Sequence, residues 1–233
     1  MMIRHWSNLS ERPALPAGDC QLWLAWLDEE DPDSFRGFLS GDERKRAGRL
    51  RSPCSADRFT VARGILRALL GRYLASKPEQ MVFSYGPHGK PGLADGLQAG
   101  LSFNVSHSGG LAVFAIANGF GVGVDIEEIH PVRDLEATAS IFLSPDELAE
   151  FEALPAAGKL ERFFTVWTCK EAILKAFGSG FTSPVRDILT TFCQPGPKGD
   201  GQNAIFGNKG LTLLNPAEGF KGALACLYPL FKE

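Results

Sequence analysis

Two acidic residues stand one residue apart at the end of an apolar run, in the stretch VGVDIEE. With the side-chain period of two that a β-strand has, Asp125 and Glu127 project from one face while Val124 and Ile126 project from the other. Two carboxylates that project together repel each other unless a cation neutralises them, and Mg²⁺ is the hard cation that carboxylates and phosphate oxygens usually hold. The pattern predicts a magnesium site, with a strand that simply ends in solvated acids as the alternative.

A third carboxylate, Glu171, lies in the stretch FFTVWTCKEAILKAFG, which has the apolar spacing of a core-facing helix. The apolar stripe consists of Phe163, Val166, Ile173, Leu174 and Phe177. Lys170 falls in the middle of this stripe, and Lys175 falls four residues after Glu171 at its edge. Two lysines next to a metal site are what a pyrophosphate needs for its remaining charge. An ordinary i,i+4 Glu–Lys pair, which contributes about 0.3 to 0.5 kcal/mol, explains Lys175 but does not explain Lys170.

Residues 43–58, ERKRAGRLRSPCSADR, form a locally basic segment in an otherwise acidic chain. Its basic residues are Arg44, Lys45, Arg46, Arg49, Arg51 and Arg58. A run of charge is more often a solvated helix face than a binding site. The alternative is an anion site, to which Arg58 and Arg63 would contribute from the start of the following helix.

Two turns add further candidates for ligand contact. GKPGL places Lys90 on a Gly-Pro turn, where a rigid backbone can hold the lysine toward a ligand. FNVSHSG places Ser106 and His107 next to each other on a strand, so their side chains point to opposite faces and do not form a Ser-His nucleophile pair. For His107, a contact to phosphate and a purely structural hydrogen bond remain equally open.

The composition indicates an ordinary globular protein. With 233 residues, 44% hydrophobic content and a net charge of −3, the chain can bury a core and has no bulk attraction to nucleic acid or to an anionic membrane. The five cysteines are scattered without a CxxC pair, which argues against a disulfide framework or a zinc site. The first residues contain no apolar signal segment, and no stretch is long enough to span a membrane, so we expect a cytoplasmic protein.

Short sequence matches at a common offset favour an internal repeat, with common helix-start sequences such as Ser-x-Asp-Glu as the alternative. LSGDE at 39–43 returns as LSPDE at 143–147, and Arg58-Phe59 returns at the same offset as Arg162-Phe163. Apolar runs that end in acids precede both copies, and β-rich runs follow both, so we expect an α+β fold made of two similar halves, residues 1–118 and 119–233. Halves related by a pseudo-twofold would enclose an active-site cleft and would favour a monomer. When one inserted helical turn is allowed for, Arg63 aligns with Glu171.

The motifs GKPGL, FNVSHSGG, GVDIEEI and WTCKEAILKAFGSG, in this order, resemble those of the surfactin-type phosphopantetheinyl transferases. The resemblance covers residues 39–182 and includes the internal duplication. It implies an enzyme that transfers phosphopantetheine from coenzyme A to a serine of an apo carrier protein and releases adenosine 3′,5′-bisphosphate. It also implies two α+β halves with the active site between them, and a carrier-docking region near residues 130–142.

The resemblance implies a role for each matching residue. Asp125, Glu127 and Glu171 match the Mg²⁺ ligands, Glu171 also matches the base for the carrier serine, and Lys175 matches the lysine that contacts the phosphate chain. The remaining matches are contacts to coenzyme A: Arg58, His107 and Arg46 at the 3′-phosphate and pyrophosphate, and Lys90 and Ser106 at the adenine end. Lys170 would face phosphate beside Lys175.

Two other functions fit some of the same residues. A Mg²⁺-dependent nucleotide pyrophosphate hydrolase would use the same carboxylates and lysines, with water in place of the carrier serine. A non-enzymatic module that binds coenzyme A or a carrier protein gains little from carboxylates that repel one another.

Overall fold

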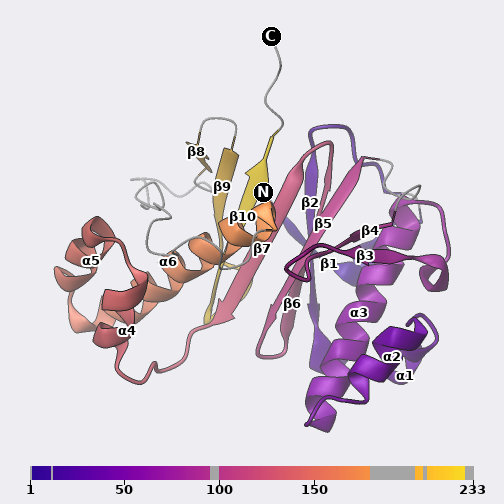
Figure 1. Cartoon of the computed structure of the whole chain (residues 1–233), viewed down its shortest axis with the longest axis horizontal. Helices are drawn as coiled ribbons and strands as arrows, with labels where there is room; N and C mark the ends of the chain where they lie inside the picture. Colours follow the sequence, from indigo (N-terminus) through magenta and orange to yellow (C-terminus); the bar gives the residue numbers. More distant parts are fainter. Residues whose placement is uncertain (1, 12, 95–99, 179–202, 207–208, 229–233) are drawn as a thin grey trace.

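The computed structural model describes residues 2–11, 13–94, 100–178, 203–206 and 209–228, and it contains two four-stranded sheets with helices on their outer faces (Figure 1). The first sheet has the order β1 (Ile3–His5), β2 (Cys20–Trp26), β6 (Leu111–Asn118), β5 (Leu101–Ser108). The second has the order β7 (Gly121–Glu128), β10 (Phe220–Leu227), β9 (Lys209–Leu214), β8 (Asn203–Phe206). All neighbouring strands are antiparallel except β1 and β2.

The helices come in two groups, one after β2 and one after β7. α1 (Asp33–Arg36), α2 (Gly41–Ala47) and α3 (Pro53–Tyr73) follow β2. α4 (Leu135–Phe142), α5 (Pro145–Glu152) and α6 (Ala156–Phe177) follow β7. Short 3-10 turns at Trp6–Asn8, Leu27–Glu29 and Pro78–Gln80 and a small ribbon of β3 (Phe83–Tyr85) and β4 (Pro91–Leu93) complete the described chain. The predicted α+β class is therefore confirmed.

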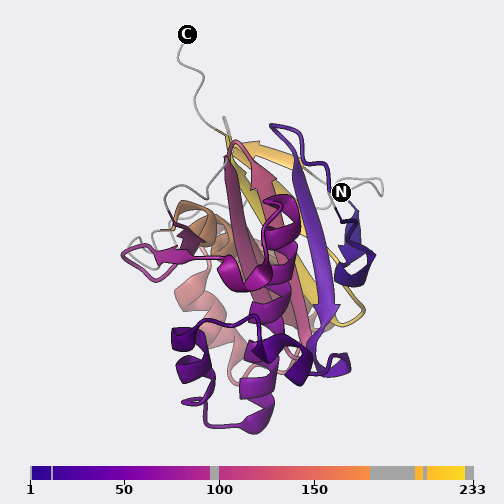
Figure 2. The same cartoon turned by 90° about the vertical axis from the view of Figure 1, so that its right-hand side faces the viewer.

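Both groups of elements have the same connectivity. When β1 and β8 are left aside, one strand (β2 or β7) is followed by helices and later by two more strands of the same sheet, and the sheet order is first, last, middle: β2-β6-β5 and β7-β10-β9. The long helices α3 and α6 have 21 and 22 residues and lie on opposite outer sides of the molecule (Figure 1). The second view looks onto the side of α3, which lies in front of the strands of the first sheet (Figure 2).

The strand alternation explains the layering. In β6, Phe114 and Ile116 belong to the core under α3, while Val113 and Ala115 belong to a second core shared with β7 and β10. Each sheet therefore buries one face against its own helix and part of the other face against the opposite sheet. One consequence is that the edge strands β5 and β7 meet, and we call this line of contact the β5–β7 seam.

The repeated LSGDE and LSPDE sequences start the short helices α2 and α5. In each, the serine side chain accepts from the backbone N–H of the glutamate three residues on, whose carboxylate accepts from the serine N–H: Ser40 with Glu43, and Ser144 with Glu147. Each glutamate is also buried against a cation of the long helix. Glu43 lies 2.7 Å from Arg67 of α3, and Glu147 lies 2.7 Å from Lys170 of α6.

The prediction that Lys170 faces phosphate is wrong. Its side chain is 0% exposed, and its Nζ lies 2.7 Å from Glu147 and donates to the Phe142 carbonyl at 3.1 Å. A charge inside the apolar stripe is tolerated because a carboxylate from another helix is buried with it. Lys170 therefore fixes α6 to α5 rather than contacting a ligand.

Among the described residues, no helix combines the length and the apolar character that a membrane crossing needs.

We predict that Glu147→Gln lowers the free energy of unfolding by about 3 to 5 kcal/mol, because it removes the carboxylate charge that faces a fully buried ammonium. The matched control is Lys45→Gln, which breaks a pair of exposed side chains 3.9 Å apart and should change stability little. Urea unfolding followed by circular dichroism measures both. Equal unfolding midpoints for the two variants would contradict the stabilising role of the Glu147–Lys170 pair.

Candidate functional site

Asp125 and Glu127 lie side by side on the face of β7 that the strand period predicted. Val122, Val124 and Ile126 are buried in the shared core, whereas Asp125 and Glu127 turn toward polar side chains of β5. Asp125 is only 3% exposed, and its Oδ1 accepts from Ser106 Oγ at 2.9 Å and from Lys175 Nζ at 2.6 Å. Burial raises the pKa of Asp125, and the Lys175 ammonium and the Ser106 hydroxyl oppose that rise.

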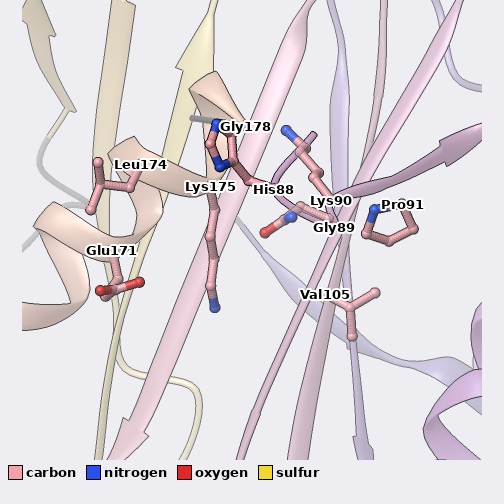
Figure 3. Close-up of a pocket in the computed structure, with 10 residues that line it drawn as sticks. His88, Gly89, Lys90, Pro91, Val105, Glu171, Leu174, Lys175 and Gly178 are labelled. Atoms are coloured by element: carbon pink, nitrogen blue, oxygen red, sulfur yellow. The ribbon is translucent and has the colours of Figure 1, made fainter. Parts of the chain in front are cut away.

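Close packing of α6 on β7 brings Glu171 and Lys175 to these carboxylates. A Cβ at Gly123 would lie 2.2 Å from both Ala172 O and Ala176 N, so only a glycine allows the helix to lie so close to the strand. The Lys175 side chain extends from α6 between Glu171 on one side and Val105 and Pro91 on the other (Figure 3). They line a pocket together with His88, Gly89, Lys90 and Gly178, which we call the carboxylate pocket.

The electrostatics of this pocket fit a hard cation. The pKa of Glu171 is raised by burial and then by the negative charge of Asp125, while Lys175 lowers it. One oxygen of Asp125, Oδ2, and one of Glu171, Oε1, are buried without a hydrogen-bond partner. Carboxylate oxygens left without donors are the ligands that Mg²⁺ prefers.

In the described parts of the chain, no three acidic, histidine or cysteine side chains already converge at metal-binding positions. The Lys175 ammonium instead sits against Asp125 and supplies the positive charge there.

A second pocket adjoins the first along β5 and is lined by arginine and aromatic side chains. We call it the arginine pocket; its walls include Arg46, Phe59, Arg63, Tyr85 and His107, and it shares Gly89, Pro91, Asn104 and Val105 with the carboxylate pocket.

The guanidinium groups in the wall of the arginine pocket stack on aromatic rings. The Arg46 guanidinium lies 5.3 Å from the centroid of Phe59, and that of Arg63 lies 5.8 Å from Phe59 and 5.2 Å from Phe83. Arg63 is nearly buried, its Nε lies 3.5 Å from Glu43, and its Nη1 has no hydrogen-bond partner. Positive charge in this wall is therefore only partly neutralised, which favours an anionic ligand with an aromatic ring.

Arg58 and His107, which the resemblance implied as contacts to coenzyme A, lie in different surroundings. Arg58 donates to Asp28 through two bonds, Nε to Oδ1 at 2.7 Å and Nη2 to Oδ2 at 2.6 Å, so it already has an anionic partner. This pairing holds the pKa of Asp28 below its usual range. His107 lines the arginine pocket, where desolvation and the positive charge of Lys175 lower its pKa and favour the neutral ring.

The resemblance implied that Lys90 and Ser106 line an adenine site, and in the structure the polar atoms of both side chains bond within the protein. Lys90 Nζ donates to the carbonyls of Val122 at 3.1 Å and Ala176 at 3.0 Å, and so ties the β3–β4 turn to β7 and to the end of α6. Burial lowers the pKa of Lys90 to about 8. Ser106 is buried against Asp125, on the face of β5 opposite to His107, as the strand period predicted.

Comparison with known proteins assigns a family to this arrangement. A family model described as the 4′-phosphopantetheinyl transferase superfamily matches residues 121–208. The 4′-phosphopantetheinyl transferase HetI of Nostoc sp. is 40% identical over 183 residues, which are 77% of this chain and 77% of that protein. The chain belongs to the 4′-phosphopantetheinyl transferase superfamily.

Other members of the superfamily match over a similar extent. The 4′-phosphopantetheinyl transferase psf-1 of Bacillus pumilus is 34% identical over 164 residues, which are 70% of this chain and 68% of that protein. The 4′-phosphopantetheinyl transferase Sfp of Bacillus subtilis is 28% identical over 170 residues, 73% of this chain and 74% of that protein. The resemblance to the surfactin-type transferases is thereby confirmed.

Sequence reasoning did not single out several residues that contact the predicted site residues or β7. Asp28 was read only as one of the acids after a strand, and Phe59 only as part of the repeat. Asn104 and Ser108 have side chains that contact β7, and their spacing of two with Ser106 was a signal that the FNVSHS stretch offered. The Ser179-Gly180 end of the last motif and Cys193 lie outside the described residues, and the four described cysteines are free thiols.

We predict that Gly123→Ala reduces transferase activity by at least tenfold and lowers the free energy of unfolding by about 1 to 3 kcal/mol. The added methyl would push α6 away from β7 and carry Glu171 and Lys175 away from Asp125. Gly121→Ala is the matched control, because a Cβ there meets Leu227 and Ala176 at ordinary distances of 3.6 and 3.8 Å. Carrier modification and thermal unfolding are measured for both, and equal activity of the two variants would refute the close-packing argument.

Proposed function

We propose that the chain transfers 4′-phosphopantetheine from coenzyme A to a serine of an apo carrier protein, with Mg²⁺ as the metal. The membership in the superfamily sets the enzyme class, and the two adjoining pockets carry the assignment of substrate. Coenzyme A combines a pyrophosphate with an adenosine that carries a further phosphate. The carboxylate pocket suits the first group through Lys175 and a metal, and the arginine pocket suits the second through Arg46 and Arg63.

The single observation that carries this proposal is the continuity of the two pockets. They share Gly89, Pro91, Asn104 and Val105, so one extended ligand can occupy both without crossing the protein surface. Aromatic rings and guanidinium groups on one side can stack on a base and bind its phosphate. On the other side, Glu171 and Lys175, with Asp125 next to Lys175, can hold a metal-bound pyrophosphate.

The chain's own residues account for the proton and charge changes of the reaction. The carrier serine oxygen forms a bond to the β-phosphorus of coenzyme A while the bond from that phosphorus to the bridging oxygen breaks, and adenosine 3′,5′-bisphosphate leaves. Glu171 accepts the serine proton, as a general base within reach of the pyrophosphate site would. Lys175 lies beside Glu171 and can neutralise the leaving phosphate.

Asp125, Glu127 and Glu171 would hold the Mg²⁺ ion, which supplies Lewis-acid stabilisation of the pyrophosphate charge.

We also propose that the halves 1–118 and 119–233 arose by duplication and are related by a pseudo-twofold. The shared strand order and the repeated Ser–Glu capping boxes support this relation. A protein with such an internal interface needs no second copy, so we propose a monomer that acts in the cytoplasm, where coenzyme A is available. For carrier docking we propose the region of residues 130–142, where Ile141 exposes 77% of its surface.

The test is incubation of the chain with coenzyme A, Mg²⁺ and an apo carrier protein, followed by intact-protein mass spectrometry. One phosphopantetheine should be added to one carrier serine, and removal of the metal by a chelator should stop the reaction. Glu171→Gln should reduce the rate by a factor of about 10² to 10⁴ without unfolding the protein, because general-base catalysis contributes a factor of this size.

A pyrophosphate hydrolase would behave differently in the same assay. It would cleave coenzyme A at equal rates with and without carrier and would leave several unrelated apo carriers unmodified. That outcome would overturn the transferase proposal in favour of the hydrolase. If Glu171→Gln still modified the carrier at the normal rate, only the assignment of Glu171 as the general base would be overturned.

A further inference from the structure

The β5–β7 seam is held by side chains of β5 that bond to the backbone of β7. β7 pairs with β10 on one of its edges. Because the backbone N–H groups of a strand point alternately to its two edges, every second N–H of β7 points away from β10, toward β5. Three of these donors are satisfied by β5 side chains: Val124 N–H by Asn104 Oδ1 at 2.8 Å, Ile126 N–H by Ser106 Oγ at 3.3 Å and Glu128 N–H by Ser108 Oγ at 3.1 Å. We call these three contacts the seam ladder.

The two serines of the seam ladder also bond to the acidic side chains. Ser106 Oγ donates to Asp125 Oδ1 at 2.9 Å, and Ser108 Oγ donates to Glu127 Oε2 at 2.7 Å. Each serine therefore accepts from the backbone N–H of one residue and donates to the carboxylate of the residue before it.

The number of donors and acceptors of a hydroxyl fixes the direction of these bonds. A serine hydroxyl has one hydrogen and two lone pairs. On Ser106, the lone pairs receive the Ile126 N–H and the Lys175 ammonium, the latter at 3.0 Å. The single hydrogen is then committed to Asp125 Oδ1, so this oxygen is held toward β5 while the other oxygen, Oδ2, has no hydrogen-bond partner.

We infer that Ser106 and Ser108 are positioning residues that orient Asp125 and Glu127 for metal binding, by holding one oxygen of each carboxylate and leaving the other for the cation. This inference rests on the proposed function, since it concerns the metal of that reaction. In this inference Ser106 donates a hydrogen bond to a metal-binding carboxylate and does not contact the nucleotide. Hydrogen bonds from neighbouring groups to metal-binding carboxylates commonly change metal affinity by about 10- to 100-fold.

A third serine on the same strand provides a matched control. Ser102 Oγ donates to the Phe120 carbonyl just before β7, so it also links β5 to the second half, but it contacts no carboxylate. A purely structural role of the seam serines would make Ser102→Ala and Ser106→Ala equivalent in every measurement. A positioning role would separate them in metal affinity.

The experiment measures binding of Mn²⁺, a paramagnetic substitute for Mg²⁺, to the full chain with coenzyme A by electron paramagnetic resonance. Ser106→Ala and Ser108→Ala should each weaken Mn²⁺ binding by about tenfold or more. Ser102→Ala should bind Mn²⁺ like the wild type, and Ser106→Thr, which keeps a hydroxyl, should recover most of the affinity. Circular dichroism of every variant shows whether it is folded, and only folded variants are compared. If Ser106→Ala does not fold, Ser108→Ala tests the inference in its place.

The outcomes separate this inference from the proposed function. If the wild type modifies the carrier and the folded alanine variants at positions 106 and 108 bind Mn²⁺ within twofold of it, the positioning role is overturned and the transferase proposal stands. If the wild type binds no Mn²⁺ and modifies no carrier, the transferase proposal and this inference are both overturned.

Discussion

The meeting of two edge strands is the constraint on which the rest of this structure depends. An edge strand has unpaired backbone N–H groups, and burying them without partners costs free energy. β5 and β7 are both edge strands of their sheets, and the seam ladder of Asn104, Ser106 and Ser108 supplies side-chain acceptors to β7 where a continuous sheet would supply carbonyls. The two four-stranded sheets are joined by polar groups at this line and by the shared apolar core behind it.

The polar side chains of the seam allow a charged residue to be buried inside the molecule. Asp125 can be buried because Ser106 and Lys175 bond to it, and Lys175 can reach it because Gly123 lets α6 lie directly on β7. The same strand β5 forms a wall of both the carboxylate pocket and the arginine pocket. The seam therefore brings acidic groups of β7 and α6 close to basic groups of α2 and α3.

The two groups of helices use the same stabilising contact. In both, a capping glutamate of a short helix is buried with a cation of the long helix, Glu43 with Arg67 and Glu147 with Lys170. The groups differ in the side chains that they place in the pockets: α6 adds the carboxylate of Glu171, whereas α2 and α3 add Arg46 and Arg63. The stabilising pairs are thus common to both groups, and the chemistry differs between them.

Local sequence patterns predicted the features that depend on a single helix or strand. They did not predict the contacts between side chains of different helices, strands or loops. The faces of Asp125 and Glu127 and the opposite directions of Ser106 and His107 follow from the strand period, so the sequence predicted them. Lys170 was misassigned because a helical stripe does not reveal that Glu147 of another helix is buried beside it. The Arg58–Asp28 pair and the Lys90 contacts join segments far apart in the chain, and no local pattern encodes them.

The most direct test of the account is a crystal structure of the chain with coenzyme A and Mn²⁺, with the metal located from its anomalous scattering. The account predicts that the metal lies between the carboxylates of Asp125 and Glu171, that Lys175 has moved from Asp125 to phosphate, and that the adenosine lies against Phe59 and Arg46. A metal bound away from β7, or a nucleotide bound outside the arginine pocket, would contradict the claim that the β5–β7 seam builds one continuous site.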